Sequence, residues 1–464
     1  MRRMRKFCCR VVVGSLCLMM LLSLAQFARA ADTLNWNTSQ SRVDADIKSW
    51  TLPHLLEQVA TRTGWRVYLE PGVSREVSAR FKNQTPGDAL RLLIGDLNFA
   101  LVPETNGSSR LFIFRTGREN ATQLINPAGK DSQGKIARHV LNELIVTLKP
   151  GEKIEDLARL VGAKVVGKID GINAYRLQFS DEASTNSALL LLGSNPAVAG
   201  IDYNYIVDPP PTPLGLVSTT VPPVQLKLVP PAGNGQVIVG LPDTGLQSMG
   251  SDLDKFILKS LSVVGDATLD PNSPSHGTSM AEAILRGAAA SGGGSSSMQI
   301  VSVDVYGPNP TTTMFDVAAG IVQAVNNGAN VINLSLGGQG DSQFLHTLIQ
   351  QVTARGIPVF AAAGNDGSAE TFYPAAYPEV TAVTASSQGK IAAYANYGSF
   401  VDVMAPGTTV VYLNNASFIV SGTSTSTALV SGLTAGLATS KNLSVSDAAN
   451  AVKTSPAFKP PATP

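Results

Sequence analysis

The sequence predicts an α/β protein whose parallel sheet is covered by helices on both faces and is preceded by two small α+β domains. Three observations lead to this fold class. Strand-like and helix-like stretches alternate through residues 233–455. Two shorter units, 31–120 and 139–207, each mix strands with helices. With 464 residues, 44% of them apolar and 15% charged, the chain is globular and long enough for several domains.

Residues 1–30 form a leader. Basic residues cluster within positions 2–10, an apolar run extends from Val11 to Phe27, and Ala28-Arg29-Ala30 has the small-x-small pattern of a cleavage site. This pattern predicts a signal peptide and a secreted, periplasmic or cell-envelope protein without a membrane span once the leader is removed. The alternative is an uncleaved anchor, although the run is shorter than the roughly 20 residues of a span.

Cysteine content and charge exclude several classes of protein. All three cysteines lie in the leader, so the mature chain has no disulfide, no thiolate nucleophile and no cysteine metal site. Removing the six basic residues of the leader changes the formal net charge from +1 to −5. We therefore expect no nucleic-acid partner, because such proteins carry a basic surface.

The unit 31–120 begins with a strand at 43–47 and a helix with apolar residues at helical spacing. A second helix opens at Thr85-Pro86, with a capping hydroxyl before proline. Further strands are expected at 77–81, 99–103 and 111–115. The phrase DIKSWTLPHLLEQVATRTGWRVYLEPGV, with VSARFKNQTPGDALRLLIGDLNFAL after it, resembles the short N-terminal domain of secretins and TonB-dependent receptors. That resemblance implies a protein-binding module with an envelope protein as its partner.

A polar linker, 121–138, leads to the unit 139–207. Its two halves each have the order strand, helix, strand: ELIVTLK, EKIEDLARLV and AKVVGKI, then NAYRLQF, a helix around 183–192 and AVAGIDYNY. This order predicts a ferredoxin-like sandwich. The unit resembles the inhibitory propeptide domain of subtilases, with an unrelated α+β module as the alternative. Three proline clusters make 208–232 an extended linker, and 456–464 is a short proline-rich tail.

The first candidate catalytic residue follows a buried strand that runs into Asp243-Thr244-Gly245. Aspartic peptidases also use Asp-Thr-Gly, but their chemistry needs two such aspartates that share a proton. The sequence contains no second Asp-Thr-Gly or Asp-Ser-Gly. If Asp243 is catalytic, its partners must therefore be residues other than a second aspartate.

Only one of the four histidines stands where a loop turns into a helix of small residues, namely His276 in PSHGTSMAEAI. The same stretch contains Gly-Thr-Ser-Met-Ala ending at Ala281, which spells the serine motif of subtilases. A second Gly-Thr-Ser ends at Ser424, after a short strand and before another helix of small residues. The order Asp243, His276, Ser424 is that of subtilisin. We therefore predict Ser424 as the nucleophile and a structural or neutral role for Ser279.

The resemblance to subtilases extends over residues 235–440. It also rests on ANVINLSLGG (329–338), GIPVFAAAGNDG (356–367), FYPAAYPEVTAVTAS and FVDVMAPG. It implies a subtilisin-like sheet and a serine endopeptidase that acts on peptides or proteins through an acyl-enzyme. The resemblance places Asn365 in the oxyanion hole. It further implies that six residues bind the substrate backbone and border the primary specificity pocket, namely Ser335, Leu336, Gly337, Gly338, Ala363 and Gly364.

Two departures from the family pattern stand out. Thr425-Ser426-Thr427-Ala428 follows the serine where Met-Ala-x-Pro is usual, and proline at positions 308 and 310 removes backbone donors near the second substrate-binding edge. No cofactor and no metal ligand are predicted. Calcium binding is left open, because the family often binds calcium but no Asp-rich loop occurs here.

The resemblance further implies a zymogen that processes itself. The propeptide-like unit would inhibit the enzyme, with its last strand in the cleft paired to the strand ending in Ser335–Gly338. The stretch 208–232 would leave the cleft as a flexible tether, and self-cleavage is expected between Tyr205 and Gly235. Two alternatives come from other classes: a catalytically idle subtilase-like protein that binds envelope proteins, and a component of an envelope secretion system.

Overall fold

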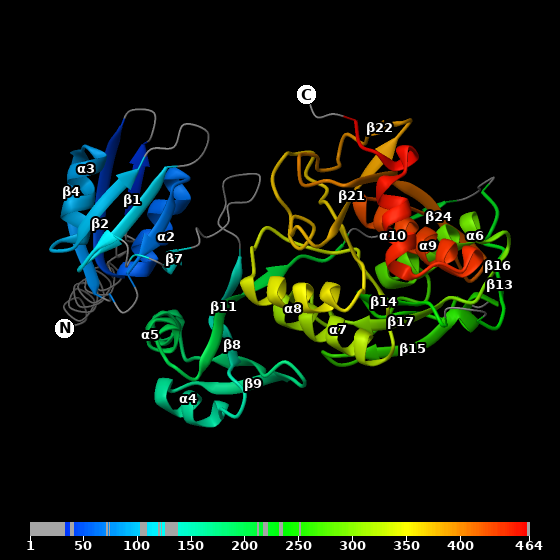
Figure 1. Cartoon of the computed structure of the whole chain (residues 1–464), viewed down its shortest axis with the longest axis horizontal. Helices are drawn as coiled ribbons and strands as arrows, with labels where there is room; N and C mark the ends of the chain where they lie inside the picture. The colour runs from blue at the N-terminus through cyan, green and yellow to red at the C-terminus, as the bar shows by residue number, and fades with distance from the viewer. Residues whose placement is uncertain are drawn as a thin grey trace, which may run out of the picture.

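The computed structural model describes residues 33–37, 41–70, 73, 75–102, 109–118, 121, 123–125, 138–210, 213–216, 221–231, 235–249 and 252–461. Three folded units follow one another along the chain (Figure 1). The predicted leader and most of the predicted linker 121–138 lie outside the described residues. A search of the described residues finds no helix that is long and apolar enough to cross a membrane.

The N-terminal unit contains two sheets and two helices. The three-stranded sheet has the order β1 (Thr33–Asn37), β2 (Arg42–Thr51), β4 (Glu76–Gln84). The four-stranded sheet has the order β5 (Asn98–Val102), β6 (Arg110–Phe114), β3 (Arg66–Leu69), β7 (Gln123–Ile125). Helices α2 (Leu52–Thr63) and α3 (Pro86–Ile94) each have a capping threonine and a proline within the first two helical positions. Strands β1, β3 and β7 were not expected from the sequence.

The second unit is a ferredoxin-like sandwich. Its elements are β8 (His139–Leu148), α4 (Ile154–Val161), β9 (Lys164–Ile169), β10 (Ala174–Gln178), α5 (Glu182–Gly193) and β11 (Val198–Val207). The strands form an antiparallel sheet in the order β11-β8-β10-β9. Leu144 and Val146 pack against α4 and α5, whereas Ile145 between them belongs to the core of the third unit. One face of this sheet therefore carries its own helices, and the other lies on the third unit.

The third unit is built on a mainly parallel sheet. Its order is β15 (Ile257–Ser262), β17 (Gln299–Asp304), β14 (Ile238–Asp243), β19 (Val331–Leu334), β20 (Val359–Ala362), β21 (Thr381–Ser387), β22 (Lys390–Ile391), with β23 (Val403–Pro406) also beside β21. Only β22 runs antiparallel to its neighbour in this part of the structure. Short 3-10 helices cover Asp252–Phe256 and Pro456–Phe458. This is the α/β class that the sequence predicts.

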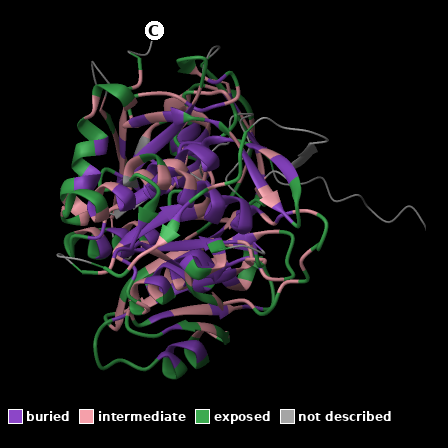
Figure 2. Ribbon diagram, turned by 90° about the vertical axis from the view of Figure 1, so that its right-hand side faces the viewer, coloured by how far each residue is buried: buried purple, intermediate pink, exposed green. Residues whose placement is uncertain are grey.

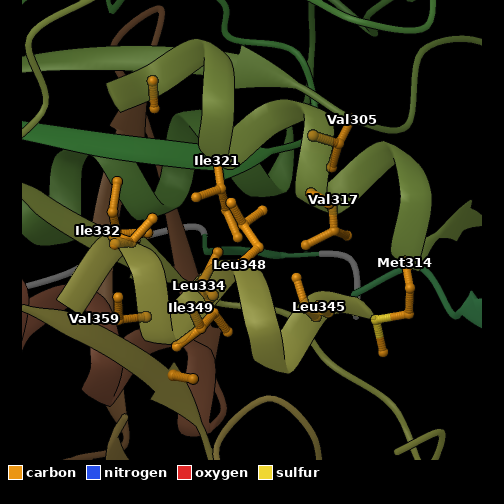
Figure 3. Packing of buried hydrophobic residues seen from close by; sticks show 14 of the residues in the cluster. Val305, Met314, Val317, Ile321, Ile332, Leu334, Leu345, Leu348, Ile349 and Val359 are labelled. Carbon is orange, nitrogen blue, oxygen red and sulfur yellow. The ribbon is translucent and has the colours of Figure 1, made fainter. Parts of the chain in front are cut away.

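Helices cover both faces of this sheet. On one face lie α7 (Met314–Asn326) and α8 (Gln343–Ala354), whose apolar side chains meet those of β19 and β20 (Figure 3). On the other face lie α6 (His276–Gly292), α9 (Thr423–Lys441) and α10 (Val445–Thr454). Val331 contributes to the second core and Ile332 to the first, as the alternation of a strand requires. Buried residues accordingly concentrate in the sheet and the helix surfaces that face it (Figure 2).

Helices α6 and α9 touch backbone to backbone. A β-carbon at Gly287 would collide with the carbonyl oxygen of Leu429, and one at Gly432 would collide with that of Ile284. The small residues of both helices therefore permit a close approach that larger side chains would prevent. This contact fixes the relative position of the two helices that begin near His276 and Ser424.

The linker predicted at 208–232 is attached to the third unit. Strand β12 (Leu214–Leu216) pairs antiparallel with β25 (Ala416–Ser421), which also pairs with β24 (Thr408–Leu413). Strand β13 (Lys227–Leu228) pairs in parallel with β16 (Ser295–Ser296). The guanidinium of Arg286 donates to the Pro222 carbonyl at 3.1 Å. The expectation of a flexible tether is therefore wrong for these residues, because backbone pairing with distant strands holds them in place.

Candidate active site

The end of β14 and the start of α6 bring Asp243 and His276 together. His276 Nδ1 lies 2.8 Å from Asp243 Oδ1 and 3.1 Å from Oδ2. The backbone N–H of Thr244 also donates to Oδ1, at 2.7 Å. Only 1% of Asp243 and 8% of His276 is exposed, so this hydrogen-bonded pair is shielded from water. The carboxylate orients the imidazole through Nδ1 and leaves Nε2 available on the other side of the ring.

The first turn of α6 is fastened to the loop that follows Asp243. Ser275 caps the helix by accepting the N–H of Thr278 at 3.0 Å, and its hydroxyl donates to the Gly245 carbonyl at 2.6 Å. The N–H of Gly277 donates to Thr244 Oγ1 at 2.8 Å. A β-carbon at Gly277 would collide with the carbonyl of Thr244. The glycine of the histidine motif is thus required for the close approach that sets the Asp243–His276 distance.

Ser279 lies inside α6. It is fully buried, and its Oγ donates to the carbonyl of Ser275 at 2.9 Å, one turn back along the helix. A serine hydroxyl that bonds to its own helix in this way is not presented to a cleft. The structure therefore brings His276, and not Ser279, to Asp243.

Ser424 lies in the first turn of α9 and is coupled to the segment after β19. Its Oγ donates to the carbonyl of Ser335 at 2.8 Å, and the Ser335 hydroxyl donates to the carbonyl of Ser424 at 2.9 Å. Behind this pair, Asn333 Nδ2 donates to Ser335 Oγ at 2.9 Å and Ser431 Oγ donates to Asn333 Oδ1 at 2.9 Å. No hydrogen bond between Ser424 and His276 occurs among the described residues.

Asn365 lies beside the first turn of α9. Its Oδ1 accepts the N–H of Thr423 at 2.9 Å and the hydroxyl of Thr423 at 3.1 Å. The same hydroxyl lies 3.2 Å from the N–H of Gly364. The described part of the chain offers no hydrogen-bond acceptor to Asn365 Nδ2, so this amide is free to donate next to Ser424. The anchoring role of Thr423 was not expected from the sequence, although the residue belongs to the Gly-Thr-Ser motif.

The predicted substrate-binding segments lie side by side. Ser335–Gly338 follows β19 and Ala363-Gly364 follows β20, and these two strands are neighbours in the parallel sheet. The carboxyl ends of parallel strands meet at one edge of a sheet, which is where such folds bind ligands. Gly338 also pairs with Tyr373, through N···O distances of 2.9 and 2.8 Å.

The last residues of β11 reach the same edge of the sheet. Ile206 pairs with Thr313 and Val207 with Thr312, in the short strand β18 (Thr312–Thr313). A β-carbon at Gly338 would lie 3.4 Å from the carbonyl of Ile206, so this glycine borders β11 on its other flank. The expected pairing with Ser335–Gly338 is therefore corrected: the hydrogen-bonded partner is β18. Strand β18 follows the prolines at 308 and 310, so their missing donors do not affect this pairing.

Two side chains of β11 cap helices of the third unit. Asp202 accepts the hydroxyl of Ser342 at 2.8 Å and the N–H of Phe344 at 3.0 Å, at the start of α8. Asn204 accepts the N–H of Phe315 at 3.2 Å, at the start of α7. Burial raises the pKa of Asp202 to about 6, although these hydrogen bonds oppose the increase. The capping contacts explain how the small sandwich is held on the large unit.

A second buried carboxylate lies next to Asp243. Asp304 ends the neighbouring strand β17, opposite Asp243 in register, and is 4% exposed. Its Oδ1 accepts the N–H groups of Tyr306 and Gly307 at 2.9 and 2.8 Å. Burial raises its pKa, and the charge of Asp243 adds to the increase. Asp304 thus shapes the turn that leads to β18, a role that no motif in the sequence indicated.

Comparisons with known proteins agree with this geometry. Residues 234–456 match the Subtilase family and residues 125–204 match the Fervidolysin N-terminal prodomain. The chain is 32% identical over 319 residues to a thermophilic serine proteinase of Bacillus sp. (strain AK1), covering 65% of this chain and 78% of that protein. It is 33% identical over 221 residues to thermitase of Thermoactinomyces vulgaris, covering 46% of this chain and 79% of thermitase.

Among solved structures, fervidolysin from Fervidobacterium pennivorans superposes with a TM-score of 0.50 at 18% identity, over 66% of this chain and 56% of that one. The epidermin leader peptide processing protease from Staphylococcus aureus also gives 0.50, at 16% identity, over 67% of this chain and 92% of that one. These likenesses concern the fold. The sequence relationships show that the chain belongs to the subtilase family of serine-type endopeptidases. It also carries a prodomain of the fervidolysin type.

Proposed function

We propose that this chain is a secreted, self-processing endopeptidase in which Ser424, His276 and Asp243 form the catalytic triad. Ser424 Oγ attacks the carbonyl carbon of the peptide bond while His276 Nε2 takes its proton. The same imidazole then gives that proton to the leaving amine, and an acyl-enzyme remains. Water attacks the acyl-enzyme by the reverse sequence and frees the serine. The buried Asp243–His276 pair at 2.8 Å is the observation that carries this proposal.

Two donors would stabilise the oxyanion of each tetrahedral intermediate. Asn365 Nδ2 is one, since its Oδ1 is already held by Thr423 and the amide therefore has a fixed orientation. The backbone N–H of Ser424, in the positively polarised first turn of α9, is the other. Such preorganised donors lower the barrier because they need no reorientation as charge develops.

The hydrogen bond from Ser424 to Ser335 has a consequence for the first step. Ser424 Oγ must exchange the carbonyl of Ser335 for His276 Nε2 before it can lose its proton. A peptide substrate that donates its own N–H to the Ser335 carbonyl would compete for that acceptor and favour the exchange. Substrate binding and activation of the nucleophile would then be coupled.

The prodomain would act as an inhibitor until it is cut from the peptidase. Strand β11 reaches the catalytic edge through Val207, and Tyr306 Oη holds the carbonyl of Asp208 at 3.0 Å. The chain then continues to β12, which pairs with the strand leading into Ser424. The strands that flank residues 208–213 are thus paired with two different parts of the site: β11 with β18, and β12 with the strand that leads into Ser424. This arrangement supports self-cleavage between Tyr205 and Gly235. The leader predicted at 1–30 would direct the zymogen out of the cytoplasm.

The N-terminal unit would bind a protein of the cell envelope. Its resemblance to the short N-terminal domain of secretins and TonB-dependent receptors supports this role. The unit is also joined to the prodomain by side-chain contact, since Tyr203 Oη donates to Glu57 at 3.4 Å. We expect the two N-terminal units to remain together after processing.

A fluorophosphonate probe tests the proposal, because only an activated serine reacts with it. The wild-type chain should be labelled and should hydrolyse a denatured protein. Ser424→Ala should lose both activities, whereas Ser279→Ala should be labelled. A folded wild-type chain that is not labelled would instead support the catalytically idle binding protein. A pull-down with residues 31–120 tests the envelope partner separately.

A further inference from the structure

An aromatic ring lies between the two segments that border the candidate specificity pocket. A β-carbon at Gly337 would lie 2.6 Å from Cε1 and 2.9 Å from Cδ1 of Phe372. A β-carbon at Gly364 would lie 3.1 Å from Cγ of the same ring. Contacts this short mean that the ring is packed against both glycines, and that only residues without side chains leave room for it.

The backbone of Phe372 is fixed by its neighbours. Tyr373 forms the bridge with Gly338, and the N–H of Ala376 donates to the carbonyl of Phe372 at 2.9 Å. A β-carbon at Gly337 would also lie 2.5 Å from the carbonyl oxygen of Tyr373. The segment that carries the ring is thus tied to the end of the Ser335–Gly338 segment, and this bridge fixes the backbone position from which the ring extends.

The position of the ring follows from the chemistry of the site. The carbonyl under attack must lie next to Ser424 Oγ, with its oxygen toward Asn365. The side chain of the residue that supplies this carbonyl, called here the acyl-side residue, then projects between the segments that follow β19 and β20. Gly337 and Gly364 are the residues of those segments that contact Phe372. The ring therefore occupies the space into which a large acyl-side side chain would extend.

We propose that Phe372 closes the primary specificity pocket and restricts the acyl-side residue to small side chains such as glycine, alanine and serine. The inference rests on the proposed function and names the substrate class for that site. Large aromatic or aliphatic residues are excluded because the pocket already contains a ring and has no room for a second one. Discrimination by shape in an apolar pocket is worth roughly 10- to 100-fold in kcat/KM for differences of this size.

The test compares wild type with Phe372→Ala and Phe372→Leu, using the full-length precursor after it has processed itself. Each protein digests a denatured protein, and mass spectrometry identifies the residue before every cut. Peptide anilides that differ only in an acyl-side Ala, Leu or Phe give kcat/KM. Phe400→Ala is the matched control, since it removes a partly buried ring that lies near Gly398 instead.

Wild type should favour Ala over Phe by roughly 10- to 100-fold. Phe372→Ala should reduce or reverse that ratio, Phe372→Leu should give an intermediate ratio, and Phe400→Ala should keep the wild-type ratio. Equal cleavage after Ala and Phe by active wild type would overturn the inference and leave the proposed function intact. An unchanged ratio in active Phe372→Ala would also overturn it. No cleavage and no probe labelling in wild type would instead reject the proposed function, and the inference with it.

Discussion

Ser424 and Ser335 hold each other through two reciprocal hydrogen bonds, with each hydroxyl donating to the backbone carbonyl of the other residue, at 2.8 and 2.9 Å. Both residues are buried. The arrangement ties the first turn of α9 to the edge of the sheet on which we expect the substrate to bind. The two residues are 89 positions apart in the chain, so the tie joins separate parts of the domain.

Ser335→Ala should weaken this tie without removing the carbonyl that Ser424 contacts. The loss leaves Asn333 Nδ2 without its buried acceptor, and the free energy of unfolding should fall by about 1–3 kcal/mol. We expect kcat to fall several-fold while KM changes little. Urea unfolding and steady-state kinetics measure the two effects. Ser431→Ala, at the far end of the same chain of hydrogen bonds, should lower stability but spare kcat. Equal kcat losses in both variants would contradict this.

Asn365→Ala should lower kcat by roughly 100- to 1,000-fold with little change in KM, a magnitude that was measured on subtilisin itself. The reason is that the Nδ2 donor, in the proposed oxyanion hole, would act on charge that develops only in the transition state. Steady-state kinetics with one peptide substrate provides the measurement. A loss that appears mainly in KM would assign Asn365 to ground-state binding. Thr423→Val, which removes one of the two donors to Asn365 Oδ1, should cost less than Asn365→Ala.

Docking of the prodomain should weaken as pH rises through about 6. The pKa of Asp202 is raised by burial in the docked state from its ordinary 3.8 to about 6, so docking favours the protonated carboxyl. This contribution is complete below about pH 4 and is lost as pH rises through 6, worth up to about 100-fold in the dissociation constant.

Calorimetric titration of the two N-terminal units into the Ser424→Ala peptidase, between pH 4 and pH 7, measures this dependence. Asp202→Asn should bind with a much flatter pH profile, because its amide does not titrate. A wild-type affinity that increases with pH would contradict the sign of the effect.

Processing should avoid the bonds that precede proline. Between Asp208 and Leu214, only the bonds before Thr212 and before Leu214 have a leaving nitrogen outside a proline ring. A proline ring at the leaving position adds bulk where His276, in the proposed mechanism, would deliver a proton. Within this stretch the released fragment can therefore begin only at Thr212 or Leu214. Both bonds follow a proline, which is larger than the residues that the proposed Phe372 pocket favours, so we expect this intramolecular cut to be slower than cleavage after alanine. N-terminal sequencing checks this, and the same fragment in Ser424→Ala would point to another protease.

Gly432→Ala should destabilise the peptidase unit strongly. Its β-carbon would collide with the carbonyl oxygen of Ile284 in α6, and the helices must separate to admit it. Overpacking of this kind costs about 1–3 kcal/mol or more. Gly87→Ala in α3 is the control, since a β-carbon there meets nothing within 4 Å. Thermal unfolding should show a lower Tm for the first variant only.

The sequence predicted the fold class and the segments of the site because those signals are local. Asp243, His276 and Ser424 each stand where a glycine-containing turn meets a strand or a helix, and short motifs describe such turns well. The class and the α/β architecture are confirmed by the structure and by the family relationship.

The rest depends on contacts between distant parts of the chain. Phe372 reaches Gly337 and Gly364 only after the sheet has formed, and nothing in its own neighbourhood marks it as part of a pocket. Strands β12 and β18 are three and two residues long, too short for a periodic pattern, and exist because other strands pair with them. The capping of α8 by Asp202 likewise joins two units, and no local pattern in the sequence indicates a contact between them.

Because β12 pairs with β25, cleavage of the linker and the onset of peptidase activity would be two separate events. A cut between Asp208 and Leu214 would free the prodomain on the acyl side, but Leu214–Leu216 would still be paired with the strand that enters Ser424. With the proposed mechanism, β12 would then lie on the leaving-group side, where the downstream half of a new substrate has to bind. The newly formed N-terminal segment would thus compete with each substrate for this binding site until β12 dissociates from β25. Onset of activity would then lag behind the appearance of fragments, by an interval set by the stability of one short strand.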